Sequence, residues 1–210
     1  MMKNILCFGD SNTYGYRPDG NGRYNEDIRW TGRLKKILGK EYNIIEEGLC
    51  GRTTVFQDEL RPGRRGIDMI SVAIESHNPL DAIIIMLGTN DCKTRYGASS
   101  HIIAQGIESI VKRAKEYARE GTKILIVSPI VLGKGVGEEG YDQEFDEHSE
   151  TVSRELAVEY EKVALKQGAL YMNAAEVAVP SVIDREHMDA ESHKRFADSM
   201  SRKVLELWNV

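Results

Sequence analysis

The segment KNILCFGDS (residues 3–11) decides the fold, because it reads as a short buried strand that ends in a tight turn. The apolar run is followed directly by Gly9, Asp10 and Ser11. These three residue types are common in turns for local hydrogen-bonding reasons, so the turn alone does not indicate chemistry. In an open α/β sheet, however, functional groups collect at the carboxyl ends of the strands. Ser11 is therefore either a nucleophile or a turn residue, and the rest of the sequence has to decide.

Four further apolar runs have the length of buried strands, at residues 42–46, 81–87, 123–128 and 170–173. The second and third of these runs are continuously apolar, as expected for strands that are covered on both faces. Amphipathic helical patterns lie between the runs, and Gly39, Gly121 and Gly168 each separate a helical pattern from the next strand. This alternation predicts an α/β fold, a three-layer α/β/α sandwich with a five-stranded, mostly parallel sheet.

The length of 210 residues predicts a single domain spanning residues 1–210. A chain of this size buries about 70% of its unfolded surface, which suffices for a core without disulfides. Residues 132–150 form an insertion rich in glycine and then in acidic residues, with no compensating base nearby. We expect a mobile, solvated excursion there, and a lid or an oligomer contact is the alternative.

The composition is that of an ordinary soluble globular protein, with 41% hydrophobic and 29% charged residues. A net charge of −5 argues against a nucleic-acid partner, and the basic cluster at residues 61–65 reads as a solvated loop with anion contacts as the alternative. Cys7, Cys50 and Cys92 lack the spacing of a disulfide framework or a zinc site, so no metal is expected. No signal peptide or membrane span is apparent, which predicts a cytoplasmic protein with no membrane partner.

A serine hydroxyl needs a base to take its proton, so the five histidines matter next. His187 lies in a loop before the final helical pattern, and Asp184 stands three residues upstream. Such a carboxylate can accept from imidazole Nδ1–H and leave Nε2 free to act as a base. Asp189 reads as a helix N-cap, and its pairing with His193 as a surface contact that faces away from the strand ends. The other histidines have structural explanations: His77 ends a helix, His101 begins one and His148 lies in the acidic insertion.

Acyl transfer also needs donors for the negative charge that develops on the substrate oxygen. The loop after the second strand carries Gly48 and Gly51, whose backbone N–H groups could approach a ligand closely. The loop after the third strand carries Asn90, which can supply a side-chain amide, and Asp91, which we expect to brace its own loop. Asp10 is expected to brace the turn before Ser11. Either loop alone reads as an ordinary turn. Candidate catalytic groups follow four of the five strands, however, and together they favour an esterase.

Four blocks in this order resemble those of the SGNH (GDSL-type) hydrolases: Gly9-Asp10-Ser11, the glycine-bearing second loop, Gly88-x-Asn90-Asp91 and Asp184-x-x-His187. Residues 28–32, 46–54 and 85–91 are further similar to the bacterial arylesterase/acyltransferase branch. The sequence departs from the family name at Asn12, where leucine is expected, and we expect this to bear little on mechanism. The acidic insertion has no counterpart in the resemblance.

The resemblance implies Ser11 as nucleophile, His187 as base and Asp184 as the residue that orients it. It also implies an oxyanion hole formed by the Ser11 N–H, the Gly51 N–H and the Asn90 side chain, with Gly48 as a second candidate in its loop. It implies no cofactor, and it leaves assembly into a homo-oligomer open.

These observations together predict a serine esterase or acyl hydrolase that cleaves small carboxylic esters through an acyl-enzyme, with acyl transfer to an alcohol as an added capacity. The alternative is a flavodoxin-like module that binds a phosphate or flavin through residues 11–15 without hydrolysis. A third interpretation is a non-catalytic scaffold with a decayed site. Aryl esters, acetylated sugars, lysophospholipids and thioesters all fit the same chemistry, so the substrate remains open.

Overall fold

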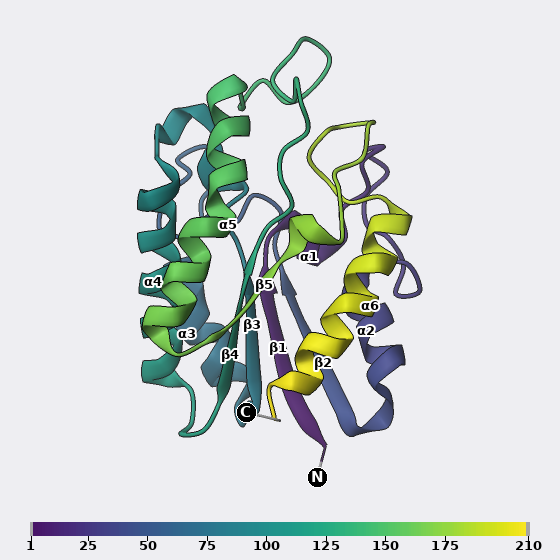
Figure 1. Cartoon of the computed structure of the whole chain (residues 1–210), viewed down its shortest axis with the longest axis vertical. Coiled ribbons are helices and arrows are strands. Elements are labelled where there is room, and N and C mark those ends of the chain that lie inside the picture. The colour runs from purple at the N-terminus through teal and green to yellow at the C-terminus, as the bar shows by residue number, and fades with distance from the viewer. Residues whose placement is uncertain (1, 209–210) are drawn as a thin grey trace.

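The computed structural model describes residues 2–208 and has a five-stranded sheet at its centre (Figure 1). The strands lie in the order β2-β1-β3-β4-β5, and every neighbouring pair is parallel. The predicted fold class is confirmed, with a sheet that is wholly rather than mostly parallel. The strands are β1 (Lys3–Gly9), β2 (Tyr42–Gly48), β3 (Ala82–Met86), β4 (Lys123–Ser128) and β5 (Leu170–Asn173).

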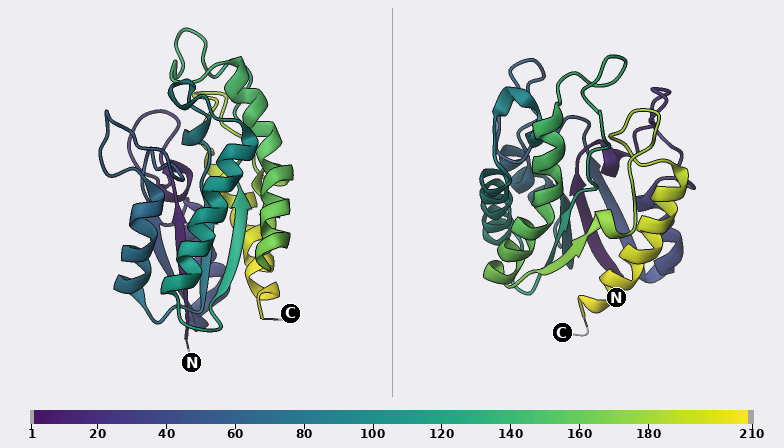
Figure 2. Two further views of the ribbon diagram at one scale, coloured as in Figure 1. Left: turned by 90° about the vertical axis from the view of Figure 1, so that its left-hand side faces the viewer. Right: turned by 45° about the horizontal axis from the view of Figure 1, so that its top comes forward.

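Helices cover both faces of the sheet (Figures 1 and 2). One face is covered by α2 (Trp30–Leu38) and α6 (Ala190–Glu206), and the other by α3 (Gly66–His77), α4 (Ser100–Tyr117) and α5 (Glu147–Gln167). Single turns of 3₁₀ helix occur at Gly39–Glu41, Asn90–Cys92, Thr94–Tyr96 and Ala174–Glu176. None of the helices within residues 2–208 is both long enough and apolar enough to cross a membrane.

The continuous apolar runs follow from this layering. In β3, Ile83 and Ile85 belong to the core beneath α3, α4 and α5, whereas Ile84 and Met86 belong to the core beneath α2 and α6. Successive side chains of a strand point to opposite faces, so a strand covered on both sides needs apolar residues at every position.

The strand order places a crevice at the carboxyl end of β1. The chain passes from β1 to β2 on one side and later places β3 on the other, and ligands bind at such reversals in open α/β sheets. The short helix α1 (Ser11–Tyr14) begins at this point, capped by Asp10, whose carboxylate accepts from Asn12 N at 3.0 Å. Gly9 is required before it, because an added Cβ would lie 2.1 Å from Thr13 Oγ1 and 2.8 Å from Met86 O.

The acidic insertion is exposed at residues 138–140, as its composition predicts, but much of the rest of it is packed against the protein. Val136 and Phe145 are buried in the core, and Glu144 forms ion pairs with Lys93, Arg95 and Arg61. These bases come from the loops that follow β2 and β3, so they are distant in sequence and the insertion looks uncompensated when it is read alone. The insertion therefore folds back over the carboxyl edge of the sheet, as the alternative interpretation allowed.

The end of the insertion is helical. Asp146 caps α5 by accepting from Ser149 N at 2.8 Å, and Ser149 Oγ in turn accepts from Asp146 N, which completes a capping box. His148 therefore lies in the first turn of α5 and not in a loop.

The pairing of Asp189 with His193 as a surface contact is also corrected. Asp189 caps α6 as predicted, accepting from Ser192 N at 2.7 Å. His193 is instead fully buried, and its Nδ1 accepts from Trp30 N at 3.3 Å. Burial lowers the pKa of His193 to about 3, so the ring is neutral and joins α6 to α2.

Candidate functional site

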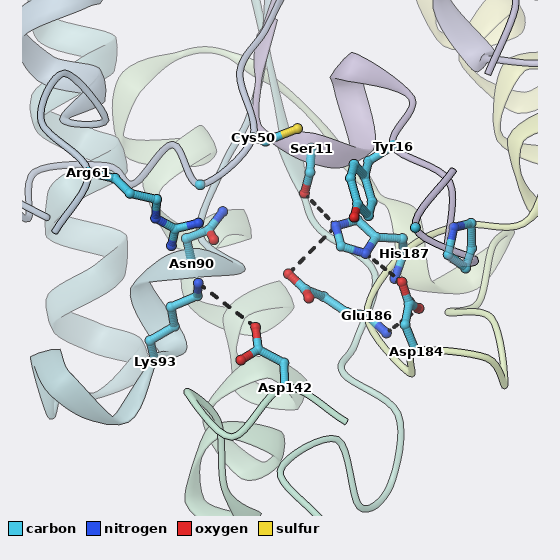
Figure 3. Close-up of a pocket in the computed structure, with 13 residues that line it drawn as sticks. Ser11, Tyr16, Cys50, Arg61, Asn90, Lys93, Asp142, Asp184, Glu186 and His187 are labelled. Carbon is cyan, nitrogen blue, oxygen red and sulfur yellow. Dashed lines mark hydrogen bonds and ion pairs between the residues drawn. The ribbon is translucent and has the colours of Figure 1, made fainter. Parts of the chain in front are cut away.

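Ser11, His187 and Asp184 form a continuous chain of contacts at the carboxyl edge of the sheet (Figure 3). Ser11 Oγ lies 2.8 Å from His187 Nε2, and His187 Nδ1 lies 2.7 Å from Asp184 Oδ2. Asp184 is an acceptor when ionised, so Nδ1 carries the proton and Nε2 is free to accept from the serine hydroxyl. The structure thus brings together the three residues that the sequence singled out, although Ser11 and His187 are 176 positions apart.

Two side chains hold the loop that carries His187. Asp184 Oδ1 accepts from the backbone N–H groups of Glu186 at 3.1 Å and His187 at 3.0 Å. From the opposite side, Asn12 Oδ1 accepts from Met188 N at 2.9 Å and Asn12 Nδ2 donates to Glu186 O at 3.4 Å. Asn12 therefore helps to hold the loop that carries His187 in place.

The electrostatic surroundings of His187 favour its protonated form. Burial lowers its pKa, but the nearby Glu186 carboxylate and the hydrogen bond and charge of Asp184 outweigh burial and raise the pKa above its usual value. The ring of Tyr16 lies against the imidazole, with 4.7 Å between centroids. His187 is thus a buried imidazole whose charged form is stabilised by the Glu186 and Asp184 carboxylates.

Hydrogen-bond donors face Ser11 from the neighbouring strand ends. Ser11 is the first residue of α1, so its N–H has no partner within the helix. Gly51 lines the same cavity with a φ of 81°, and its N–H makes no hydrogen bond to another residue in the described part of the chain. Asn90 also lines the cavity, and its Nδ2 is held by a 3.2 Å bond to Arg52 O.

The structure shows which of the two glycines, Gly48 or Gly51, lies at the cavity. Gly48 ends β2 and packs on α1, where an added Cβ would lie 2.2 Å from Tyr14 N. Gly48 is thus a close-packing glycine, whereas Gly51 is the glycine of this loop that faces the cavity.

The two supporting aspartates act differently. Asp10 braces its own turn as expected, through Asn12 N. Asp91 braces the loop after β2 and not its own, because both of its oxygens accept from Thr54 N, at 2.9 and 3.0 Å, and it also accepts from the Thr54 hydroxyl. Burial raises the pKa of Asp91 to about 7 in spite of these hydrogen bonds. Asp91 thereby ties the Asn90 loop to the Gly51 loop.

These residues surround a cavity of about 330 Å³, which is at the small end for ligand sites. Its lining also includes polar residues that the sequence did not assign to a site, among them Tyr16, Arg61, Lys93, Asp142 and Glu186. Arg61 belongs to the basic cluster, whose residues are half-buried or exposed as expected of a solvated loop, and its guanidinium pairs with Asp58 at 3.0 Å. Lys93 lies two residues after the third motif block and Glu186 lies within the fourth, and these positions were the signal available in the sequence.

The arrangement is suited to acyl transfer. A hydroxyl in contact with a base, a carboxylate that orients the base, and donors converging on the same space are the parts that nucleophilic catalysis at a carbonyl requires. Within residues 2–208, no group of three or more His, Cys, Asp or Glu side chains is placed to hold a metal ion.

Comparison with known proteins points to the same chemistry. Residues 7–196 match the model of the GDSL-like lipase/acylhydrolase family. A comparison with curated protein sequences gives no significant match. One solved structure is 38% identical, with a TM-score of 0.94 over the whole of both chains.

Named structures are also similar. The native aryl esterase of M. smegmatis is 33% identical, with a TM-score of 0.88 over 98% of this chain and 99% of that one. Est24, a carbohydrate acetylesterase from Sinorhizobium meliloti, is 32% identical, with a TM-score of 0.88 over 98% of this chain and all of the other. The flavin-binding and scaffold alternatives are therefore set aside, and the chain belongs to the GDSL-like lipase/acylhydrolase family of carboxylic ester hydrolases.

Proposed function

We propose that this protein hydrolyses small carboxylic esters, with Ser11 as nucleophile, His187 as general base and Asp184 as the residue that orients His187. The observation that carries the proposal is the contact chain from Ser11 Oγ through the imidazole to Asp184, open to a cavity that also presents Gly51 and Asn90. Membership in an esterase family supports the same reaction class.

In this mechanism Ser11 Oγ attacks the ester carbonyl carbon while its proton passes to His187 Nε2. The carbonyl oxygen becomes an oxyanion that accepts from the N–H groups of Ser11 and Gly51 and from Asn90 Nδ2. The tetrahedral intermediate collapses, the C–O bond to the alcohol breaks, and Nε2 returns its proton to the leaving oxygen. Water then attacks the acyl-enzyme with His187 again as base, and an alcohol in place of water would give acyl transfer.

The size of the cavity favours short acyl groups. A space of about 330 Å³ that is bordered by Lys93, Asp142 and Glu186 suits a compact ester with polar character better than a long lipid chain. The similar structures named for aryl ester and carbohydrate acetate hydrolysis agree with an ester of this size.

A fluorophosphonate probe tests the nucleophile directly. The probe should phosphonylate Ser11 Oγ with loss of fluoride, and peptide mass spectrometry should place the adduct on the peptide that contains Ser11. Heat-denatured protein and the Ser11→Ala variant are the matched controls and should remain unlabelled. A folded protein that carries no adduct on Ser11 would rule out the proposal.

The acid limb of the pH profile of kcat/KM should reflect the titration of His187. Only the neutral imidazole can take the serine proton, so kcat/KM should fall as pH drops through the pKa of His187 in the free enzyme. Because that pKa is raised, the midpoint should lie above the ordinary value of about 6.5. Hydrolysis of p-nitrophenyl acetate between pH 5 and 9 at constant ionic strength measures it, and a flat profile from pH 5 to 8 would point to another base.

Removal of the Asn90 amide should slow the chemistry more than it weakens binding. Asn90→Ala is expected to lower kcat by about 10²–10³-fold with a smaller change in KM, since the donor acts mainly on the oxyanion. Steady-state kinetics with p-nitrophenyl acetate measures both constants, and Asn43→Ala on β2, far from the cavity, is the matched control. A loss confined to KM would assign Asn90 to substrate binding instead.

A further inference from the structure

Glu186 presents an unused carboxylate to the cavity. Its side chain is only 9% exposed, and the carboxylate forms no hydrogen bond with any residue in the described part of the chain. Its backbone is fixed on both sides, because Glu186 N donates to Asp184 and Glu186 O accepts from Asn12. The side chain lies beside His187 and lines the cavity (Figure 3).

The charged groups that face Glu186 give it no hydrogen bond, and in the described part of the chain its one ion-pair contact is His187 Nε2 at 3.7 Å. Lys93 and Asp142 face it from the loop after β3 and from the acidic insertion, and Asp184 and His187 from its own loop. Lys93 Nζ is already engaged by Glu144, with Asp142 at 4.0 Å. The carboxylate therefore keeps its hydrogen-bonding capacity free for a ligand in the cavity.

The position of Glu186 relative to His187 indicates which part of a substrate it meets. Glu186 Oε1 lies 3.7 Å from His187 Nε2, the atom that returns the proton to the departing alcohol oxygen. That oxygen must come within hydrogen-bond distance of Nε2, so the carbon atoms attached to it lie beside the Glu186 carboxylate. An ionised carboxylate only accepts hydrogen bonds, and a protonated one both donates and accepts, so either form binds a hydroxyl group.

We propose that Glu186 is a specificity-determining residue that binds a hydroxyl group on the carbon next to the ester-bearing carbon of the alcohol, so that monoesters of vicinal diols are preferred substrates. This inference rests on the proposed role of His187 as the base that protonates the leaving alcohol. Sugar and glycerol esters contain the required pair of neighbouring oxygens, whereas simple alkyl esters do not.

A pair of nearly isosteric esters tests the inference. 2-Hydroxyethyl acetate and propyl acetate differ only in a terminal hydroxyl in place of a methyl group, and the ratio of their kcat/KM values measures recognition of that hydroxyl. The ratio is determined for the wild type, Glu186→Gln and Glu186→Met, each at the pH of its own plateau. Comparing the same ratio between enzymes cancels the intrinsic reactivity difference of the two esters.

We expect the ratio to fall about tenfold or more in Glu186→Met and less in Glu186→Gln, which keeps an acceptor. Asp142→Asn is the matched control, because it removes another cavity carboxylate that already has Lys93 near it, and its ratio should equal that of the wild type. Glu186→Gln should also move the acid limb of kcat/KM to lower pH, since Glu186 helps to hold the His187 proton. If Glu186 had a purely structural role, its substitution would change neither the kcat/KM ratio of the two esters nor the pH of the acid limb.

The outcomes separate this inference from the proposed function. If the wild type cleaves p-nitrophenyl acetate but the ratio is the same in Glu186→Met, or falls equally in Asp142→Asn, then Glu186 does not read the hydroxyl. If no ester is cleaved and Ser11 resists the fluorophosphonate, the proposed function itself fails and the inference fails with it.

Discussion

Ser11→Ala should lower kcat for ester hydrolysis by at least about 10⁴-fold, because no other group can attack the carbonyl from the same position. Ser11 Oγ contacts His187 Nε2 and faces the cavity, and its loss leaves the imidazole still held by Asp184. The cap of α1 by Asp10 and the Asn12 hydrogen bonds are also retained. We therefore expect a folded protein that retains substrate binding but has lost the acylation step.

The measurement pairs kinetics with thermal unfolding. A Tm within a few degrees of the wild type, together with the loss of kcat, would assign the effect to chemistry. Ser99→Ala, which removes a hydroxyl that caps α4 and lies outside the cavity, serves as a control for the loss of a serine. Retention of more than about a tenth of the wild-type kcat in Ser11→Ala would contradict the role of Ser11 as nucleophile.

Asp184→Asn should lower kcat by about 10⁴-fold while the fold survives. The asparagine oxygen can still accept from the Glu186 and His187 backbone N–H groups, as Asp184 Oδ1 does. Its NH₂ group would then face His187 Nδ1, so the imidazole would carry its proton on Nε2 and could not accept from Ser11. The substitution thus changes the tautomer and leaves the loop in place.

Asp184→Ala provides the contrast. It removes the acceptor for two backbone N–H groups as well as the partner of the imidazole, so its Tm should fall below that of Asp184→Asn. Kinetics and thermal unfolding of both variants separate the two functions of this carboxylate. A loss of less than tenfold in kcat for Asp184→Asn would mean that the tautomer of His187 is set by another group.

The sequence was sufficient for the sheet and for the groups that converge on Ser11. The continuous apolar run in β3 indicates that both faces of the strand are buried, and this can be recognised from the sequence of that one strand. Because parallel strands end at one edge, the positions of Ser11 and Asn90 after separate strands already implied proximity. His187 stood out because its carboxylate partner is only three residues away, so that contact too is readable locally.

Contacts between loops that are far apart in the sequence could not be predicted from local sequence patterns. Lys93 and Glu144 are 51 residues apart, and nothing in the acidic insertion indicates which base it will meet. His193 looked like a surface residue because its partner, the backbone of Trp30, lies on another helix. Glu186 is distinctive because its carboxylate makes no hydrogen bond while the neighbouring Lys93 is engaged by Glu144, and that follows from the full set of pairings.

The two hydrogen bonds of Asn12 have a consequence for how this architecture tolerates change. They connect the residue after Ser11 to the residues on either side of His187, so one buried amide side chain ties the positions of Ser11 and His187 together. The loops at residues 14–25 and 132–146 line the same cavity and also support this region, since Tyr16 packs against His187 and Gly133 N donates to Arg185 O at 2.7 Å. A change in either loop should therefore alter both access to the cavity and the support of His187, whereas the Asn12 link between the two halves of the site lies outside them.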